Sequence, residues 1–239
     1  MAQGLPKARR VGGHTRRLTW ILSGLIVVLL GVVGYLLLGT SLFDDAPQTS
    51  AERDYLVLLE AARKDPKNTE ILMTLAEAEY ALGKKRDALE HAEAAVKLGG
   101  EETDYRFRFA MLLVREDRLD EAEGLLEKEI ELVGKDSAEP YFLLAQVRFE
   151  QQETEEALEM MRRALEINPM AADMRATYAG MLERSGDEEG AIEQYQTALK
   201  FLPGNADIID ALGRLGVQVD ETGSVDPHGG SMPVEGSDQ

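Results

Sequence analysis

A long uninterrupted apolar run near the N-terminus is the strongest feature of the hydrophobic pattern. Residues 18–43 contain no charged side chain, and the stretch from Trp20 to Leu38 is almost entirely apolar. A helix of about 20 apolar residues crosses the hydrocarbon core of a bilayer, and a soluble helix of a small protein is not apolar on all its faces. The pattern therefore predicts a transmembrane helix in contact with the lipid bilayer from Leu18 to Phe43.

The alternative to an uncleaved anchor is a secretory signal peptide. A signal peptide has a shorter apolar region and a small-x-small cleavage site, which the segment from Gly39 to Phe43 matches poorly. Residues 1–17 carry five basic and no acidic side chains, whereas Asp44 and Asp45 follow the run. The positive-inside rule then predicts a cytoplasmic basic leader, residues 1–17, with the chain beyond Phe43 on the extracytoplasmic side.

The remainder of the pattern repeats with a period of about 34 residues. Four alanines that each follow a polar turn recur at separations of 34, 35 and 34 residues: Ala88, Ala122, Ala157 and Ala191. A second alanine lies twelve positions before each of them: Ala76, Ala110, Ala145 and Ala179. The first half of each period carries apolar residues at helical spacing, such as Leu72, Leu75 and Tyr80. The pattern therefore predicts packed helices, whose close approach the small alanine side chains permit.

This pattern resembles the tetratricopeptide repeat (TPR), a helix–turn–helix unit of 34 residues. The resemblance covers residues 69–205 as four units, 69–102, 103–136, 138–171 and 172–205. It implies an all-α fold in which one N-terminal transmembrane helix precedes a TPR superhelical solenoid with flanking capping helices. Glu129 stands where the other units have an alanine, and we expect the second unit to be the most loosely packed.

The segments on either side of the repeats complete this expected organisation. Residues 44–68 hold a linker and an amphipathic stretch, Ser50–Lys64, which predicts an N-terminal capping helix. Residues 206–217 predict a C-terminal capping helix. A solenoid needs such caps because each repeat buries its apolar face only against its neighbours. Residues 218–239 are rich in Gly, Ser, Pro and acidic residues, a composition that predicts a disordered acidic tail.

The chain carries no convergent set of reactive groups. It has no cysteine, and its three histidines lie in the leader, in a repeat and in the tail: His14, His91 and His228. Motifs for a nucleophilic serine, a phosphate-binding loop or a zinc protease are absent from the sequence. The many acidic pairs fall at turns and helix starts, where the helix dipole favours them. We therefore expect no enzyme activity, no catalytic residue, and no bound cofactor or metal.

The resemblance implies a concave groove, lined by the first helix of each repeat, that binds extended or helical peptides. The groove residues expected from it are Met73, Glu77, Tyr80, Phe107, Met111, Arg115, Phe142, Gln146, Phe149, Glu183 and Arg184. Val114, Glu150 and Gly180 are expected on the same faces. The sequence also allows an alternative for Phe107, Met111 and Phe142, which is that they pack between helices as core.

The charge of the chain restricts its partners. The formal net charge of −18 is the sum of a basic leader and a strongly acidic remainder. Nucleic acid is not expected as a partner, because phosphate binding needs a basic face. Basic or apolar segments of client proteins are the partners that the acidic repeats favour.

The leading functional hypothesis is a membrane-anchored TPR scaffold of the bacterial plasma (inner) membrane, which helps to assemble an envelope complex. The segment Gly34–Pro47 and the repeats after it also resemble the TPR subunit of bacterial cytochrome c maturation, which presents apocytochrome for haem attachment. That family usually has a second membrane helix and a cytoplasmic loop, which this sequence lacks. A translocon-associated periplasmic chaperone and a self-assembling structural subunit are further alternatives.

Overall fold

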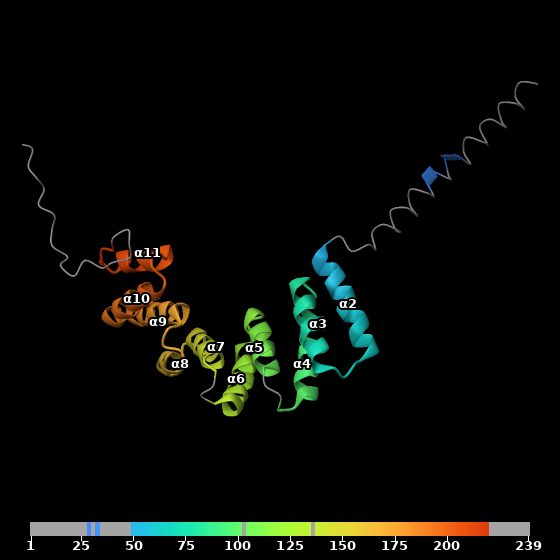
Figure 1. Ribbon diagram of the computed structural model, residues 1–239, viewed down its shortest axis with the longest axis horizontal. Helices are drawn as coiled ribbons and strands as arrows, with labels where there is room; N and C mark the ends of the chain where they lie inside the picture. Colours follow the sequence, from blue (N-terminus) through green and yellow to red (C-terminus); the bar gives the residue numbers. More distant parts are fainter. Residues whose placement is uncertain (1–27, 30–31, 34–48, 102–103, 135–136, 220–239) are drawn as a thin grey trace, which may run out of the picture. The chain divides into compact units, whose positions relative to one another are not determined.

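The computed structural model describes residues 28–29, 32–33, 49–101, 104–134 and 137–219. Within these residues the chain is all-α, with ten helices and no strand (Figure 1). The helices are α2 (Ser50–Lys64), α3 (Thr69–Ala81), α4 (Lys85–Gly99), α5 (Tyr105–Arg115), α6 (Leu119–Val133), α7 (Glu139–Glu150), α8 (Thr154–Ile167), α9 (Ala172–Ser185), α10 (Glu188–Phe201) and α11 (Ala206–Arg214).

Consecutive helices from α3 onward pack as antiparallel pairs. The pairs are α3 with α4, α5 with α6, α7 with α8 and α9 with α10, and the second helix of each pair contacts the next element in the chain (Figure 1). The first helices α3, α5 and α7 also contact one another in sequence. Residues 69–214 therefore form an α-solenoid of helical hairpins, which confirms the solenoid expected from the 34-residue period.

The predicted membrane segment lies almost entirely outside the described residues. Of the range 18–43, the structure describes only residues 28–29 and 32–33, which are helical and carry exposed valine and leucine side chains. Among the described parts of the chain, none of the helices combines the length and the apolar character needed to cross a bilayer. The anchor, the basic leader 1–17 and nearly all of the acidic tail 218–239 stay predictions.

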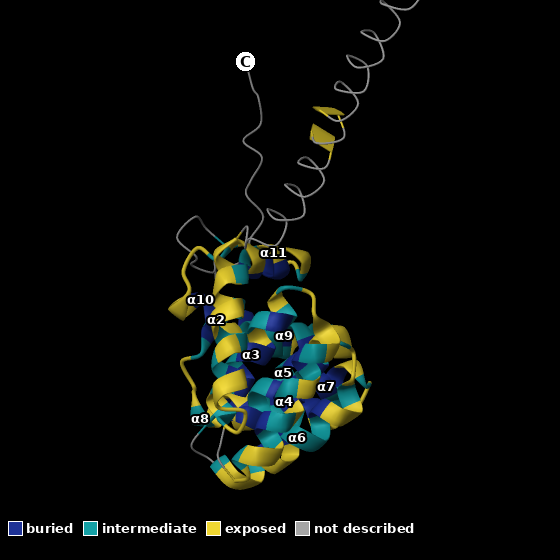
Figure 2. Cartoon of the chain, turned by 90° about the vertical axis from the view of Figure 1, so that its right-hand side faces the viewer, coloured by how far each residue is buried: buried dark blue, intermediate teal, exposed yellow. Residues whose placement is uncertain are grey.

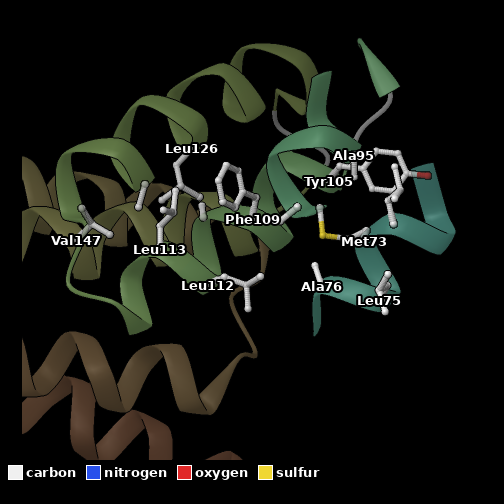
Figure 3. Close-up of a cluster of buried hydrophobic side chains, with 14 of the residues drawn as sticks. Met73, Leu75, Ala76, Ala95, Tyr105, Phe109, Leu112, Leu113, Leu126 and Val147 are labelled. Carbon is white, nitrogen blue, oxygen red and sulfur yellow. The ribbon is translucent and has the colours of Figure 1, made fainter. Parts of the chain in front are cut away.

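The repeating alanines lie where the helices pack most closely. Ala76, Ala88, Ala110 and Ala122 have no exposed surface, and the same holds for their counterparts in the third and fourth units. Large apolar residues fill the space around them, as the cluster in Figure 3 shows for Met73, Leu113, Leu126 and their neighbours. Exposed residues face outward from the packed helices (Figure 2). Burial of this apolar surface is the main contribution that stabilises the array.

Gly99 permits one of these close contacts. A Cβ atom added at this last residue of α4 would lie 2.8 Å from Cδ2 of Tyr105. The Tyr105 side chain is almost fully buried, and its hydroxyl oxygen accepts a hydrogen bond of 3.1 Å from Thr69 Oγ1. A glycine at the end of the first unit thus allows an aromatic ring of the second unit to pack against α4.

Glu129 occupies the position at which the other three units have an alanine. Its side chain is 1% exposed, and its Oε1 accepts a hydrogen bond of 3.0 Å from the backbone N–H of Asp104. The other carboxylate oxygen lies 3.7 Å from Nη1 of Arg106. Because Asp104 has a φ of 85°, the start of α5 departs from regular geometry, and the buried carboxylate satisfies a backbone donor there.

The turn between the two helices of each repeat contains one residue in the left-handed conformation. These residues have φ values of 76°, 58°, 69° and 90° and are Gly83, Asp117, Gln152 and Gly186. Only glycine adopts this conformation without a steric penalty from Cβ. The second and third units therefore carry strain at Asp117 and Gln152 that the first and fourth do not.

Replacing Gln152 by glycine should stabilise the array for this reason. The steric cost of left-handed geometry exceeds the extra backbone entropy that glycine loses on folding, so we expect a gain of about 0.5–1 kcal/mol. Urea unfolding followed by circular dichroism measures it. The matched control, Gln196→Gly within α10, should destabilise by about 1 kcal/mol. A loss of stability in Gln152→Gly would contradict the interpretation.

Candidate peptide-binding groove

A cavity of about 350 Å³ lies among the first helices of the second, third and fourth units. The residues that line it come from α5, α7 and α9 and from the start of α6: Val114, Leu119, Gln146, Val147, Phe149, Glu150, Thr177, Gly180, Met181 and Arg184. Aliphatic, thioether and aromatic side chains provide most of this lining, and a few polar groups accompany them. We call this cavity the α5–α7–α9 pocket.

Phe149 and Arg184 form one side of the pocket. Phe149 is 8% exposed and belongs to a buried cluster with Met161, Met174 and Met181. The guanidinium carbon of Arg184 lies 4.4 Å from the centroid of the Phe149 ring, which is a cation–π contact. The side chain of Arg184 is 63% exposed, and Nη1 reaches Glu150 Oε1 at 3.4 Å. Such an exposed ion pair holds the arginine only weakly.

Gly180 leaves space on the pocket side of α9. A Cβ atom added at this position would meet only the hydroxyl of Tyr195, at 3.4 Å. A glycine inside a helix costs stability of about 0.5–1 kcal/mol relative to alanine. Its effect here is that position 180 contributes no side chain beside Thr177, Met181 and Arg184, which line the cavity from α9.

Three of the eleven predicted groove residues line this pocket: Gln146, Phe149 and Arg184. The prediction for Met73 was wrong, because this side chain has no exposed surface and lies in the first hydrophobic cluster. Phe107 and Phe142 are half-buried and pack against the hydrophobic clusters, and neither lines the pocket. Met111 is half-buried on α5 and does not line the pocket.

Two of the charged residues expected in the groove, Glu77 and Glu183, make contacts with other parts of the array and do not line the pocket. Arg108 donates to Glu77 through Nε at 2.7 Å and Nη2 at 2.8 Å, and its Nη1 reaches Glu70 at 3.2 Å. Glu183 accepts from the hydroxyl of Tyr195 at 3.1 Å and lies 3.5 Å from Nη2 of Arg214. Glu77 and Glu183 are therefore engaged in contacts within the array.

Tyr80 and Arg115 belong to a similar contact between the first and second units. The Tyr80 hydroxyl donates to Glu116 Oε1 at 2.7 Å, and Lys85 Nζ lies 2.8 Å from the same oxygen. Arg115 stands over the Tyr80 ring at 5.7 Å. Burial raises the pKa of Tyr80, and the hydrogen bond from Lys85 lowers the pKa of Glu116. This network fixes the junction of α3 and α5.

Four lining residues were not anticipated: Leu119, Val147, Thr177 and Met181. Val147 and Met181 each follow, by one position, a residue that was expected in the groove. Both are at least 95% buried and count as core in any pattern of helical spacing. Val147 and Met181 are 34 residues apart and so occupy equivalent positions in successive repeats. This equivalence is the signal that could have found them, because one edge of each buried side chain reaches the cavity.

Metal binding in the described part of the chain would need several histidine and carboxylate groups close together. His91, the one histidine within it, lies 2.7 Å from the buried carboxylate of Glu79, a pairing within the first hairpin. Groups of three or more His, Asp or Glu placed to hold a metal ion do not occur among these residues.

Tyr195 offers a pH-dependent test of the packing near the pocket. Burial, together with the hydrogen bond to Glu183, raises its pKa to about 12. The neutral phenol is then favoured in the fold, so its contribution to stability is complete below the unfolded pKa of about 10 and is lost as pH rises through about 12. We expect the pH dependence of unfolding in this window to be weaker in Tyr195→Phe. An unchanged slope in urea titrations at pH 9 to 12 would contradict this assignment.

The architecture is an α-solenoid of helical hairpins with an apolar pocket on its first helices. Tetratricopeptide repeat models match residues 104–170 and 142–206. Together with the fold, these matches identify residues 104–206 as tetratricopeptide repeats.

Solved structures of TPR proteins have the same fold. PilF of Pseudomonas aeruginosa is 18% identical with a TM-score of 0.62, over 79% of this chain and 81% of that one. MamA of Desulfovibrio magneticus is 21% identical with a TM-score of 0.59, over 65% and 87%. YrrB, a TPR protein with an unusual peptide-binding site, is 19% identical with a TM-score of 0.54, over 66% and 81%. No curated protein matches the chain significantly.

Proposed function

We propose that this protein is a membrane-anchored TPR scaffold that binds segments of client proteins in the α5–α7–α9 pocket. It would act on the outer side of the bacterial plasma membrane and assist the assembly of an envelope complex. The observation that carries this proposal is the apolar pocket on the first helices. A concave apolar site with a few polar groups is the usual form of a ligand-binding site.

The repeats themselves support a binding function. TPR proteins bind protein or peptide partners, and the related fold of YrrB includes a peptide-binding site. Between residues 54 and 219 the chain has 36 acidic and 20 basic side chains. This excess of negative charge attracts basic segments and repels acidic ones, so we expect clients with an apolar anchor and basic flanks.

The membrane part of the proposal rests on the sequence. The uncharged run from Leu18 to Phe43, with a basic leader before it and Asp44 and Asp45 after it, supports an anchor with the repeats outside the cytoplasm. In the sequence, only residues 44–49 lie between this run and α2, which begins at Ser50. The repeats would therefore work close to the membrane surface.

Cysteine labelling tests this orientation cleanly, because the chain contains no cysteine of its own. A single cysteine in place of the exposed Glu93 should react with a membrane-impermeant maleimide in spheroplasts. A single cysteine in place of Ala8 in the leader should react only after lysis. The reverse pattern would contradict the proposed topology.

Site-specific photo-crosslinking tests client binding. A photoreactive residue at Gln146 or Thr177, both half-buried and lining the pocket, should capture a protein in intact cells. The matched control is Lys128, which is exposed on α6 outside the pocket. Equal capture from Lys128, or no capture from the pocket positions, would contradict the proposal. A captured apocytochrome would indicate a role in cytochrome c maturation, and a captured secretory precursor a role at the translocon.

A further inference from the structure

We propose that the α5–α7–α9 pocket recognises an aromatic side chain of the client segment. The inference rests on the proposed function and adds to it the chemistry of the residue that anchors the client. Its basis is that three different groups around the cavity, a cation, a thioether and a ring, each interact favourably with an aromatic ring.

Arg184 supplies the cation. Its guanidinium already lies over the ring of Phe149, at 4.4 Å, and the side chain is 63% exposed. Its ion pair with Glu150 is long, at 3.4 Å, and both partners are exposed. Arg184 is therefore free to shift from its resting contact and to cover a second ring placed beside Phe149, because a guanidinium interacts favourably with an aromatic face.

Met181 and Phe149 supply the apolar surface that such a ring would contact. The Met181 side chain lines the pocket and is 5% exposed, and the buried cluster behind it contains Met161 and Met174. Thioethers interact favourably with aromatic rings, and flexible methionine side chains adjust to the shape of a ligand. Two aromatic rings also attract each other beyond the area they bury, with offset or edge-to-face geometry.

Gly180 and Gln146 complete the site. The missing side chain at Gly180 lets a flat ring approach α9 closely, where a Cβ atom would meet only the Tyr195 hydroxyl. The amide of Gln146, half-buried beside the cavity, makes no hydrogen bond to any described residue. It therefore offers one donor group and one acceptor to the backbone of the segment that carries the ring.

The acidic repeats determine what flanks the ring. With 36 acidic against 20 basic side chains between residues 54 and 219, basic neighbours are favoured over acidic ones. The proposed partner is thus a segment with one aromatic residue between lysines or arginines.

A panel of fluorescently labelled peptides tests the inference on the purified 239-residue chain. The probes have the form fluorescein-Ser-Lys-Ser-X-Ser-Lys-Ser-amide, with the same N-terminal dye on each and X as tryptophan, phenylalanine, leucine or alanine. Fluorescence anisotropy should give affinities about fivefold tighter for the two aromatic peptides than for leucine, and weaker still for alanine. In Arg184→Gln the aromatic preference should fall to about twofold or less, whereas Arg162→Gln on the exposed face of α8 should leave it unchanged.

Equal affinity for phenylalanine and leucine would overturn the inference, and so would a preference that survives Arg184→Gln. If none of the four peptides binds at millimolar concentration, the claim that the pocket binds one client side chain is wrong. The crosslinking from Gln146 and Thr177 distinguishes these failures from failure of the proposed function, because client capture at the pocket does not depend on which side chain enters it.

Discussion

Gly180→Leu is expected to weaken client binding strongly while the protein stays folded. The leucine side chain would project from α9 into the α5–α7–α9 pocket and fill the space that a client side chain needs. Because deep anchor residues dominate the binding energy of such sites, we expect at least about a tenfold loss of affinity. Capture from a photoreactive residue at Thr177, and anisotropy with the phenylalanine peptide, should both show this loss.

Gly180→Ala is the matched control for this result. Its Cβ atom has only a contact of 3.4 Å to the Tyr195 hydroxyl, so it fits the pocket wall. Alanine has a higher helix propensity, and we expect the free energy of unfolding to rise by about 0.5–1 kcal/mol with a much smaller loss of affinity. If Gly180→Leu binds clients as the natural chain does, the pocket is not the binding site.

Leu113→Ala is expected to destabilise the repeats by about 2–5 kcal/mol. Leu113 has no exposed surface and lies in the first hydrophobic cluster, among residues contributed by the first three units (Figure 3). Truncation removes its transfer free energy and leaves a cavity that the rigid helical hairpins fill only in part. Urea unfolding followed by circular dichroism measures the change.

Leu132 provides the control for Leu113 with the same substitution on the same repeat. Its side chain is 43% exposed near the end of α6, so Leu132→Ala should cost less than about 1 kcal/mol. A cost for Leu113→Ala as small as that of Leu132→Ala would contradict the assignment of Leu113 to the core. The whole array should respond to Leu113→Ala, because each repeat is stabilised by its interfaces with its neighbours.

The helical hairpins could be predicted from the sequence because their determinants are local and recur. The alanines at Ala88, Ala122 and their counterparts mark the positions where two helices touch, and the structure buries all of them. The amphipathic stretch Ser50–Lys64 coincides with α2, whose Ala62 is buried and whose Tyr55 and Leu58 pack against the first cluster. In each case the spacing of apolar residues along one helix is enough to predict the helix and its buried face.

The groove residues could be predicted only in part, because they depend on contacts between repeats. Met73 and Met181 have the same chemistry and both belong to first helices, yet Met73 is enclosed by its neighbours and Met181 reaches the cavity. Arg108 binds Glu77 across 31 residues of sequence, so an apparently free carboxylate is already paired. Helical spacing within one unit does not reveal either arrangement.

The pocket itself is a property of three consecutive units. It exists where α5, α7 and α9 contribute Val114, Phe149 and Met181 and where Gly180 contributes no side chain. A sequence shows the glycine but not the volume that it leaves, since that volume depends on the packing of the flanking hairpins. The contacts of Arg175 also depend on packing between helices. Its guanidinium donates to Gln194 and to the carbonyl of Pro169, which holds the α8–α9 turn, and the sequence did not predict these bonds.

The claim that clients bind in the α5–α7–α9 pocket is tested most directly by methionine methyl NMR of the ¹³C-labelled chain. The ligand is the client segment identified by crosslinking, or the phenylalanine peptide. Met181 lines the pocket, Met73 is sealed in the first cluster and Met170 is 68% exposed, so the three methyl signals report on the site, the core and the surface. We expect a saturable shift of the Met181 signal with those of Met73 and Met170 unmoved. A saturable shift of Met170 with Met181 unchanged would contradict it.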